Sequence, residues 1–202
     1  MLLLNDQLYI GEGEIRKCYE HPEKANLCIK IPREHVTREY TYKEILYFKK
    51  LARRDKSKYT YPFYSDFQGE IETSIGKGQI FDLIRDETTG EISKTLEFYL
   101  EEDSNLSDDK LWNALQELKK QMTIHKVFTR DLRSRNLCCK ILKNNSIQII
   151  IIDGIGHRDF FPFADLFNYF SKKKVDRTFK KWHFNSLKQQ RDFLKKEKTP
   201  DI

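Results

Sequence analysis

Two polar segments near the middle of the second half indicate the fold most clearly. They are Thr129-Arg130-Asp131-Leu132-Arg133-Ser134-Arg135-Asn136 and, after it, Ile150-Ile151-Ile152-Asp153-Gly154. A carboxylate at position 131 can accept a proton from a hydroxyl group. Asn136 and Asp153 offer oxygen ligands of the hard kind that Mg²⁺ prefers. A turn at a strand end would explain Asp153-Gly154 alone, but it leaves the two polar residues before it unexplained. The combination predicts metal-assisted phosphate chemistry.

A lysine within an apolar segment is the second feature. Lys30 stands between Ile29 and Ile31, and burying an unpaired ammonium group is costly, so an anionic partner is expected. Glu44 on the following predicted helix is the preferred partner, and Glu39 is the alternative. An edge lysine that points to water, with both glutamates on a helix surface, is the simpler explanation of the same residues.

The glycine-rich segment Ile10-Gly11-Glu12-Gly13 stands at an expected strand–turn–strand junction. Glycines at Gly11 and Gly13 let backbone N–H groups approach a phosphate without interference from side chains. A plain hairpin turn explains the two glycines equally well.

Hydrophobic periodicity and turn residues predict strands and one helix in the first half, and mainly helices in the second. The expected strands are 7–10, 14–20, 27–31, 66–73, 79–84, 137–142 and 147–152, with a turn at 76–78. The expected helices are 38–53, a short one beginning at 95–100, and 108–125, which Ser107 caps. A turn-rich connector at 86–90 separates the two halves.

Composition excludes several classes of protein. The chain has 202 residues and a net charge of +6, and aromatic residues make up 13% of it. That aromatic content can fill a core, which excludes wholesale disorder. The longest apolar run, 149–152, is far shorter than the ~20 residues of a membrane span, and no signal peptide is expected. Four cysteines without metal-binding spacing predict reduced thiols in a cytoplasmic protein.

The tail is strongly basic. Residues 172–198 contain 11 Lys and Arg against three acidic residues, a net +8. Apolar residues at helical spacing, including Phe179, Trp182 and Phe184, predict that the tail packs onto the body of the protein. A solvated helix face explains the charge more simply than a nucleic-acid contact, so no nucleic-acid partner is expected.

Together, the motifs resemble the protein-kinase-like superfamily. Gly11 and Gly13 are similar to its glycine-rich loop, Lys30 to its third-strand lysine, and 130–136 to its catalytic loop, with Asp153-Gly154 similar to its metal-binding motif. More narrowly, the chain resembles the PhoP regulatory network protein family (YrbL-like). That resemblance is carried by 10–11, 16–23, 28–30, 44–51, 81–86, 130–137 and 152–156.

The resemblance implies an α+β, protein-kinase-like fold of two lobes. The N-lobe, 1–84, would be a small antiparallel sheet with one helix, and the C-lobe, 85–202, would be compact and mostly helical. ATP and Mg²⁺ are the implied cofactors. The residues implied at the site are Asp131, Lys30 and Glu44 for catalysis, Gly11, Gly13, Lys30, Asp82, Leu83 and Ile84 for the nucleotide, and Asn136 and Asp153 for the metal.

The implied function is phosphoryl transfer from ATP to a hydroxyl acceptor, such as a small molecule, a sugar or an envelope component. Lys172–Lys174 and Arg177, if they lie near the mouth of the cleft, would favour an acceptor that is already anionic; a role in solubilising a helix is the simpler explanation of the same residues. The pattern also departs from the superfamily, because Arg16 replaces the third glycine and Gly154-Ile155 replaces Phe-Gly. The alternative is therefore a catalytically silent pseudokinase that serves as a nucleotide-binding regulatory module. The sequence leaves the acceptor and the oligomeric state open.

Overall fold

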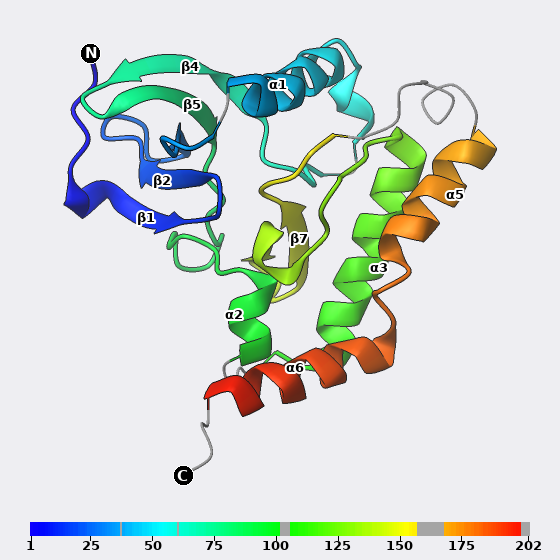
Figure 1. Cartoon of the computed structure of the whole chain (residues 1–202). Coiled ribbons are helices and arrows are strands. Elements are labelled where there is room, and N and C mark those ends of the chain that lie inside the picture. Colours follow the sequence, from blue (N-terminus) through cyan, green and yellow to red (C-terminus); the bar gives the residue numbers. More distant parts are fainter. Residues whose placement is uncertain (37, 60, 102–105, 157–167, 199–202) are drawn as a thin grey trace. The chain divides into compact units, whose positions relative to one another are not determined.

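The computed structural model describes residues 1–36, 38–59, 61–101, 106–156 and 168–198, and Figure 1 follows the chain through its elements. The chain divides into two compact units. Unit 1 comprises Met1–Asp55 and Ser65–Arg85, and unit 2 comprises Lys56–Tyr64 and Asp86–Ile202. The division after Arg85 lies one residue from the boundary expected at 84, and 56–64 is a short excursion into unit 2.

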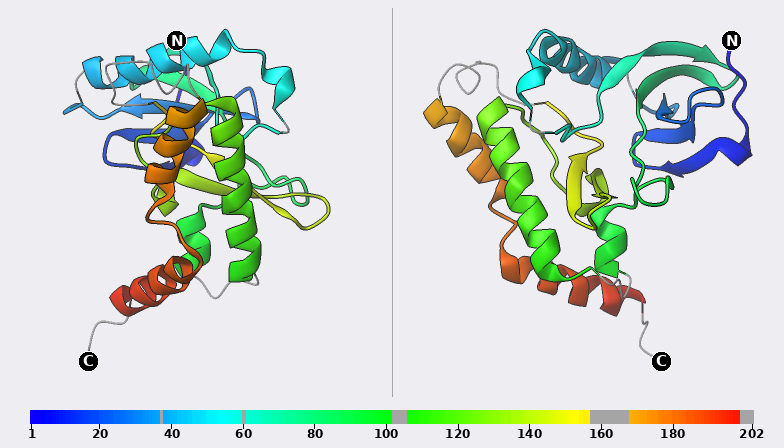
Figure 2. Two further views of the ribbon diagram at one scale, coloured as in Figure 1. Left: turned by 90° about the vertical axis from the view of Figure 1, so that its right-hand side faces the viewer. Right: turned by 180° about the vertical axis from the view of Figure 1, so that it is seen from behind.

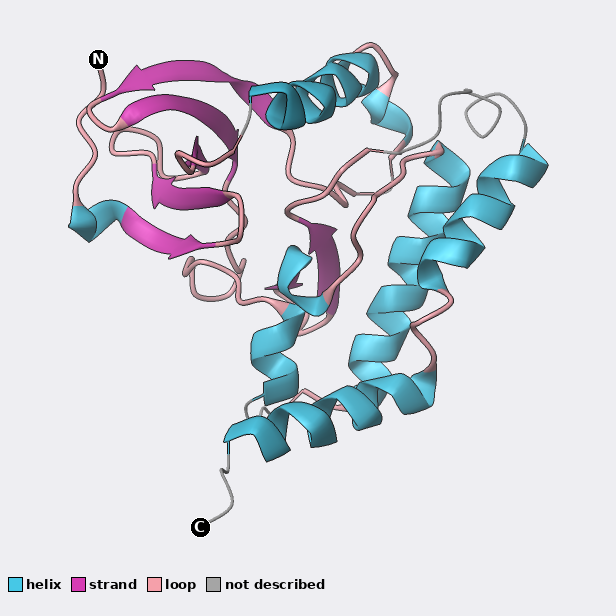
Figure 3. Cartoon of the chain, viewed as in Figure 1, coloured by secondary structure: helices cyan, strands magenta, loops and turns pink. Residues whose placement is uncertain are grey.

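Unit 1 contains an antiparallel sheet of five strands (Figure 3), which confirms the predicted sheet. Its strands are β1 (Tyr9–Glu12), β2 (Arg16–Glu20), β3 (Leu27–Pro32), β4 (Phe67–Thr73) and β5 (Gly76–Asp82), in the order β1-β2-β3-β5-β4. The first strand begins at Tyr9 and not at residue 7 as predicted, because a short 3₁₀ helix, η1 (Asp6–Leu8), includes residues 7 and 8.

The central strand β3 is buried on both faces, which explains its nearly continuous apolar sequence. Successive side chains of a strand point to opposite faces, and Ile29 and Ile31 pack with Leu4 and Tyr19 on one face. The helix α1 (Arg38–Ala52) packs against the other face, where its Glu44 pairs with Arg16 of β2. There the ring of Phe48 lies 5.5 Å from that of Phe81, measured between centroids.

The β4–β5 turn lies two residues earlier than predicted. The sequence placed it at the glycines of 76–78, but the turn is at 74–75 and these residues begin β5. Gly78 is needed for packing and not for a turn. A Cβ atom there would lie 2.5 Å from Cγ2 of Ile29 and 2.9 Å from Cδ1 of Ile31.

The described part of unit 2 consists mainly of helices (Figure 2) and contains one two-stranded sheet. Its elements are η2 (Lys56–Lys58), α2 (Leu96–Glu101), α3 (Asp108–His125), η3 (Ser134–Asn136), β6 (Leu137–Ile141), β7 (Ile147–Ile151), α5 (Asn168–Phe179) and α6 (Phe184–Lys198). The predicted cap of α3 is confirmed, because Oγ of Ser107 accepts a hydrogen bond from the N–H of Lys110 at 3.4 Å. Helix α5 lies alongside α3, and α6 packs against α2 and α3.

The basic tail packs onto unit 2, as its apolar spacing predicted. Phe179 and Trp182 are buried, while the side chain of Phe184 lies outside the described part. Arg191 of α6 donates a hydrogen bond to the carbonyl of Tyr99 at 2.9 Å and pairs with Asp108 at 2.8 Å. All four cysteines are free thiols, as expected. No helix in the described ranges has both the length and the apolarity that crossing a bilayer requires.

Candidate functional site

Lys30 lies inside unit 1 and not at a sheet edge. It is 8% exposed and belongs to the middle strand of the sheet. Its ammonium nitrogen lies 4.6 Å from the centre of the Phe81 ring, and the strand register places it opposite Gln79. The side chains of Ile29 and Ile31 point to the face that carries Leu4 and Tyr19. Lys30 lies between them in the strand, so its side chain points to the opposite face, against which α1 packs.

Arg16 is a second buried cation on this side of the sheet. Its Nη1 lies 2.7 Å from Oε2 of Glu44, and both side chains are 6% exposed. The same nitrogen donates a hydrogen bond to Oε1 of Gln79 at 2.9 Å. Glu44 thus forms a buried ion pair with Arg16, and its pairing with Lys30 stays a prediction. The side chain of Glu39, the alternative partner, lies outside the described part.

The two glycines of the predicted phosphate loop lie at the β1–β2 hairpin. Gly11 is in β1, and the N–H of Gly13 donates to the carbonyl of Arg16 at 2.9 Å, which closes the turn. A Cβ atom at either glycine would meet no atom within 4 Å. The backbone is therefore approachable at both positions, while the Arg16 side chain is directed into the interior.

The predicted hinge, 82–84, begins at the last residue of β5. The N–H of Asp82 donates to the carbonyl of Asp66 at 3.1 Å, and the N–H of Leu83 donates to the carbonyl of Asn26 at 2.8 Å. Two of the N–H groups expected to meet adenine are therefore engaged within unit 1.

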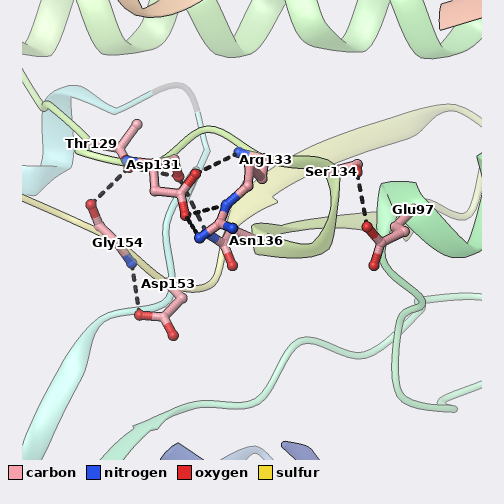
Figure 4. A network of polar contacts seen from close by, with 8 residues as sticks. All are labelled: Glu97, Thr129, Asp131, Arg133, Ser134, Asn136, Asp153 and Gly154. Carbon is pink, nitrogen blue, oxygen red and sulfur yellow. Dashed lines mark hydrogen bonds and ion pairs between the residues drawn. The ribbon is translucent and has the colours of Figure 1, made fainter. Parts of the chain in front are cut away.

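In unit 2, the segment around Asp131 is fastened to the Asp153-Gly154 turn (Figure 4). The N–H of Arg130 and the hydroxyl of Thr129 both donate to the carbonyl of Gly154, each at 2.8 Å. Gly154 has φ +77°, and a Cβ atom there would lie 3.2 Å from that of Asp131. Glycine supplies both the left-handed backbone and the close approach. The two polar segments singled out by the sequence therefore meet.

Arg133 fixes the carboxylate of Asp131. Nη2 and Nε of Arg133 lie 2.6 and 2.7 Å from Oδ2 of Asp131, and the Arg133 backbone N–H donates to Oδ1 at 3.2 Å. Burial raises the pKa of Asp131, but the hydrogen bonds and charge of Arg133 outweigh this and hold that pKa below its ordinary value. The carboxylate is therefore ionised at neutral pH and can accept a proton.

Asn136 and Asp153 are placed to present oxygen atoms. Nδ2 of Asn136 donates to the carbonyl of Asp131 at 3.4 Å, which commits the amide nitrogen and leaves Oδ1 as the group offered to a metal. Oδ1 of Asp153 accepts the N–H of Gly154 at 2.7 Å, and in Figure 4 both side chains extend downward from the loop.

These two donors fit Mg²⁺, which is commonly held by one or two protein carboxylates together with substrate phosphates. Within the described ranges, no group of three or more His, Cys, Asp or Glu side chains is arranged to hold a metal by itself. A metal ion at Asn136 and Asp153 would need further ligands from phosphate oxygens or water.

The predicted site residues thus fall into two groups, one in each unit. Those of unit 1 are Gly11, Gly13, Lys30, Glu44, Asp82, Leu83 and Ile84, and those of unit 2 are Asp131, Asn136 and Asp153. The first group offers a buried cation and an approachable glycine turn. The second offers a proton-accepting carboxylate and oxygen ligands on two segments that hydrogen bonds join.

Three residues of the site were not given a role by the sequence. Thr129 and Arg133 lie two positions to either side of Asp131, a spacing at which side chains can bond back to a turn, so a local signal existed. Trp182 donates from Nε1 to the carbonyl of Leu132 at 2.9 Å. It comes from the tail, and no local pattern could have connected it with the loop.

Comparisons with known proteins cover nearly all of the chain. Residues 2–186 match the model of the family described as PhoP regulatory network protein YrbL. A protein of Escherichia coli (strain K12) named Uncharacterized protein YrbL is 30% identical over 185 residues, which are 90% of this chain and 86% of the relative. The protein of the same name from Shigella flexneri matches to the same extent. The matched span includes every predicted site residue.

Proposed function

The chain belongs to the PhoP regulatory network protein YrbL family, and from the residues described above we propose that it is an ATP-dependent phosphotransferase with a protein-kinase-like, two-lobed fold. It transfers a phosphoryl group to a hydroxyl of a small molecule, a sugar or an envelope component. The observation that carries the proposal is that the segment with Asp131 and Asn136 is joined by hydrogen bonds to the turn that carries Asp153. A proton acceptor and two hard ligands are the groups that phosphoryl transfer requires.

Asp131 is the proton acceptor in the proposed step. The acceptor hydroxyl oxygen forms a bond to the γ-phosphorus of ATP, and its proton passes to the carboxylate of Asp131. The bond from the γ-phosphorus to the bridging oxygen breaks, and ADP leaves with that electron pair. Arg133, which holds both carboxylate oxygens, keeps Asp131 ionised and in one orientation.

The remaining residues bind the phosphates of ATP. Mg²⁺, held by Asn136 and Asp153, supplies charge neutralisation when it is bound. Lys30 contributes the protein's own positive charge for the α- and β-phosphates, as a lysine does in the kinase scheme. The open space at Gly11 and Gly13 lets phosphate oxygens approach this turn without meeting side chains, although the N–H of Gly13 itself donates to the carbonyl of Arg16.

A catalytically silent regulatory module is the second candidate. The buried ion pair between Arg16 and Glu44 favours it, because Glu44 is the residue expected to brace Lys30. Against it stands the simultaneous presence of Lys30, Asp131, Asn136 and Asp153. A chain released from catalysis would tend to lose at least one of them.

Nucleotide binding can be tested by thermal unfolding with and without Mg-ATP. A ligand that binds the folded state raises the free energy of unfolding, by about 2.7 kcal/mol at a concentration of 100 Kd. We expect Mg-ATP to raise the unfolding midpoint of the wild type, and Asp153→Asn to lose most of the Mg²⁺-dependent part. Asp192→Asn, the same change at an exposed position of α6, is the matched control and should respond as the wild type does.

Two results would contradict the proposal. One is a wild type that millimolar nucleotide does not stabilise, and the other is an Asp153→Asn protein that Mg-ATP stabilises as fully as it does the control. A protein that binds Mg-ATP but transfers phosphate to no hydroxyl acceptor would favour the second candidate.

A further inference from the structure

A small pocket in unit 2 borders the Asp131 loop. Its volume is about 140 Å³. Arg133 and Arg135 line it from the loop, and Lys181 lines it from the turn between α5 and α6. Glu97 of α2 and Gln190 of α6 complete its polar lining. The chemistry proposed above assigns no role to Arg135, Lys181 or Gln190.

The charge in this pocket is positive, since three cationic side chains outnumber the two carboxylates near them, that of Asp131, which pairs with Arg133, and one in the lining. The carboxylate in the lining, Glu97, accepts a hydrogen bond from the hydroxyl of Ser134 at 3.3 Å. Burial lowers the pKa of Lys181; the charge of Asp131 raises it, and that of Arg133 lowers it further. An anion in the pocket would relieve the repulsion between these cations.

The pocket is sized for one chemical group and not for a whole ligand. Pockets that enclose an entire small molecule measure roughly 300–1,000 Å³, well above the volume here. One wall is fixed, because the buried Trp182 donates to the carbonyl of Leu132 at 2.9 Å. Guanidinium groups match the oxygens of phosphate and carboxylate, and an ammonium group adds a point charge.

The pocket also adjoins the proposed proton acceptor. Arg133 lines the pocket and at the same time holds the Asp131 carboxylate through Nε and Nη2. A molecule with its anionic group in the pocket therefore has its neighbouring atoms within reach of Asp131, as a positioned substrate requires.

We propose that this pocket binds an anionic group, phosphate or carboxylate, of the molecule whose hydroxyl group is phosphorylated. The acceptor is then a molecule that already carries negative charge, such as a phosphorylated or carboxylated sugar. That the molecule is the phosphoryl acceptor rests on the proposed function, whereas the anion site itself rests on the pocket. The sequence assigned a similar role to Lys172–Lys174 and Arg177, and that assignment stays a separate prediction.

The test measures binding of inorganic phosphate, and separately of acetate, by calorimetric titration of the full chain without nucleotide. Lys181→Gln and Arg135→Gln should each weaken binding about tenfold or more, because each loses a charge-assisted contact. Lys180→Gln is the matched control, since Lys180 is exposed and does not line the pocket; it should change binding less than about twofold. Lys181 lies at the surface, so its replacement leaves the fold intact, which the unfolding midpoint verifies.

Each outcome separates the anion site from the proposed function. A wild type that binds neither anion, or an equal loss in Lys180→Gln, overturns the pocket. If anion binding weakens in Lys181→Gln and Arg135→Gln but not in Lys180→Gln, and the wild type transfers no phosphoryl group, the anion site is supported and the phosphotransferase activity is not. Transfer to an anionic acceptor with an unchanged KM in Lys181→Gln and Arg135→Gln supports the enzyme and overturns the pocket.

Discussion

The carboxylate of Asp131 is the single group on which the proposed chemistry depends most. Arg133 holds its two oxygens through two hydrogen bonds, from Nε and from the backbone N–H, and through an ion pair from Nη2. Contacts of this kind stabilise the ionised form and fix its direction. They also make the carboxylate a weaker base, so that it suits a step in which the proton moves as the phosphoryl group is transferred.

Removing Arg133 should change the titration of Asp131 in a defined direction. Arg133→Gln removes the guanidinium contacts that offset the raising effect of burial, so the pKa of Asp131 should rise. The chemical shift of its carboxyl carbon, followed by NMR against pH, measures this directly. Arg177→Gln, an exposed change on α5, is the control and should leave the titration where it is.

The same contact predicts how stability depends on pH. A carboxyl group whose pKa is lower in the folded than in the unfolded state stabilises the fold above its unfolded pKa. That contribution is lost as the pH falls through the folded pKa. Arg133→Gln should therefore flatten the loss of stability in acid. An Asp131 titration that does not change in Arg133→Gln would contradict this account of the site.

At the scale of residues, the sequence predicted which groups are special better than it predicted their partners. A charged residue among apolar neighbours indicates burial, and Lys30 is indeed buried. The ion pair of Glu44 with Arg16 depends on which strand lies beneath α1. That is a tertiary fact that no local pattern contains.

At the scale of elements, glycines at 76–78 were interpreted as a turn because glycine is common in turns. Gly78 is instead inside β5, where the side chains of Ile29 and Ile31 leave no space for a Cβ atom. Helix α3 was predicted with its bounds intact, because its cap and its apolar stripe are both local signals. The sequence thus predicts elements well and misplaces turns where a glycine serves packing.

The packing role of Gly78 can be measured. Gly78→Ala should lower the free energy of unfolding by about 1–3 kcal/mol, as overpacking of a core does, since the stiff, fully buried Ile29 would have to move. Chemical denaturation of the variant and of the wild type gives this difference. Gly13→Ala places a methyl group in open space and serves as the control for stability. An unfolding free energy that is equal in the two variants would show that the sheet accommodates the methyl group.

At the scale of the whole molecule, the proposed function divides its tasks between two units. Unit 1 carries Lys30 and the glycine turn, and unit 2 carries Asp131, Asn136 and Asp153, the residues of the proposed proton transfer and metal binding. The tail belongs to unit 2 as a structural part, because Trp182 supports the loop and Arg191 ties α6 to α2 and α3. Lys181 of the tail also lines the pocket for which we propose anion binding.

The family and the mixed α+β fold could be recognised from motifs spread along the chain. The site could be recognised only as far as its residues lie in continuous segments. The Asp131 loop and the Asp153-Gly154 turn were both found, because each is a local pattern. Their attachment through Thr129, and the support from Trp182, depend on contacts between distant segments.

The central claim is that Asp131 receives a proton during phosphoryl transfer from ATP. The most direct measurement follows transfer of label from γ-labelled ATP to protein, sugar and lipid-headgroup acceptors, anionic sugars among them. Asp131→Asn should lower the rate by about 10²–10⁴-fold while Mg-ATP still raises its unfolding midpoint, and Asp192→Asn should transfer at the rate of the wild type. Full transfer by Asp131→Asn, or none by the wild type to any acceptor, would contradict the claim.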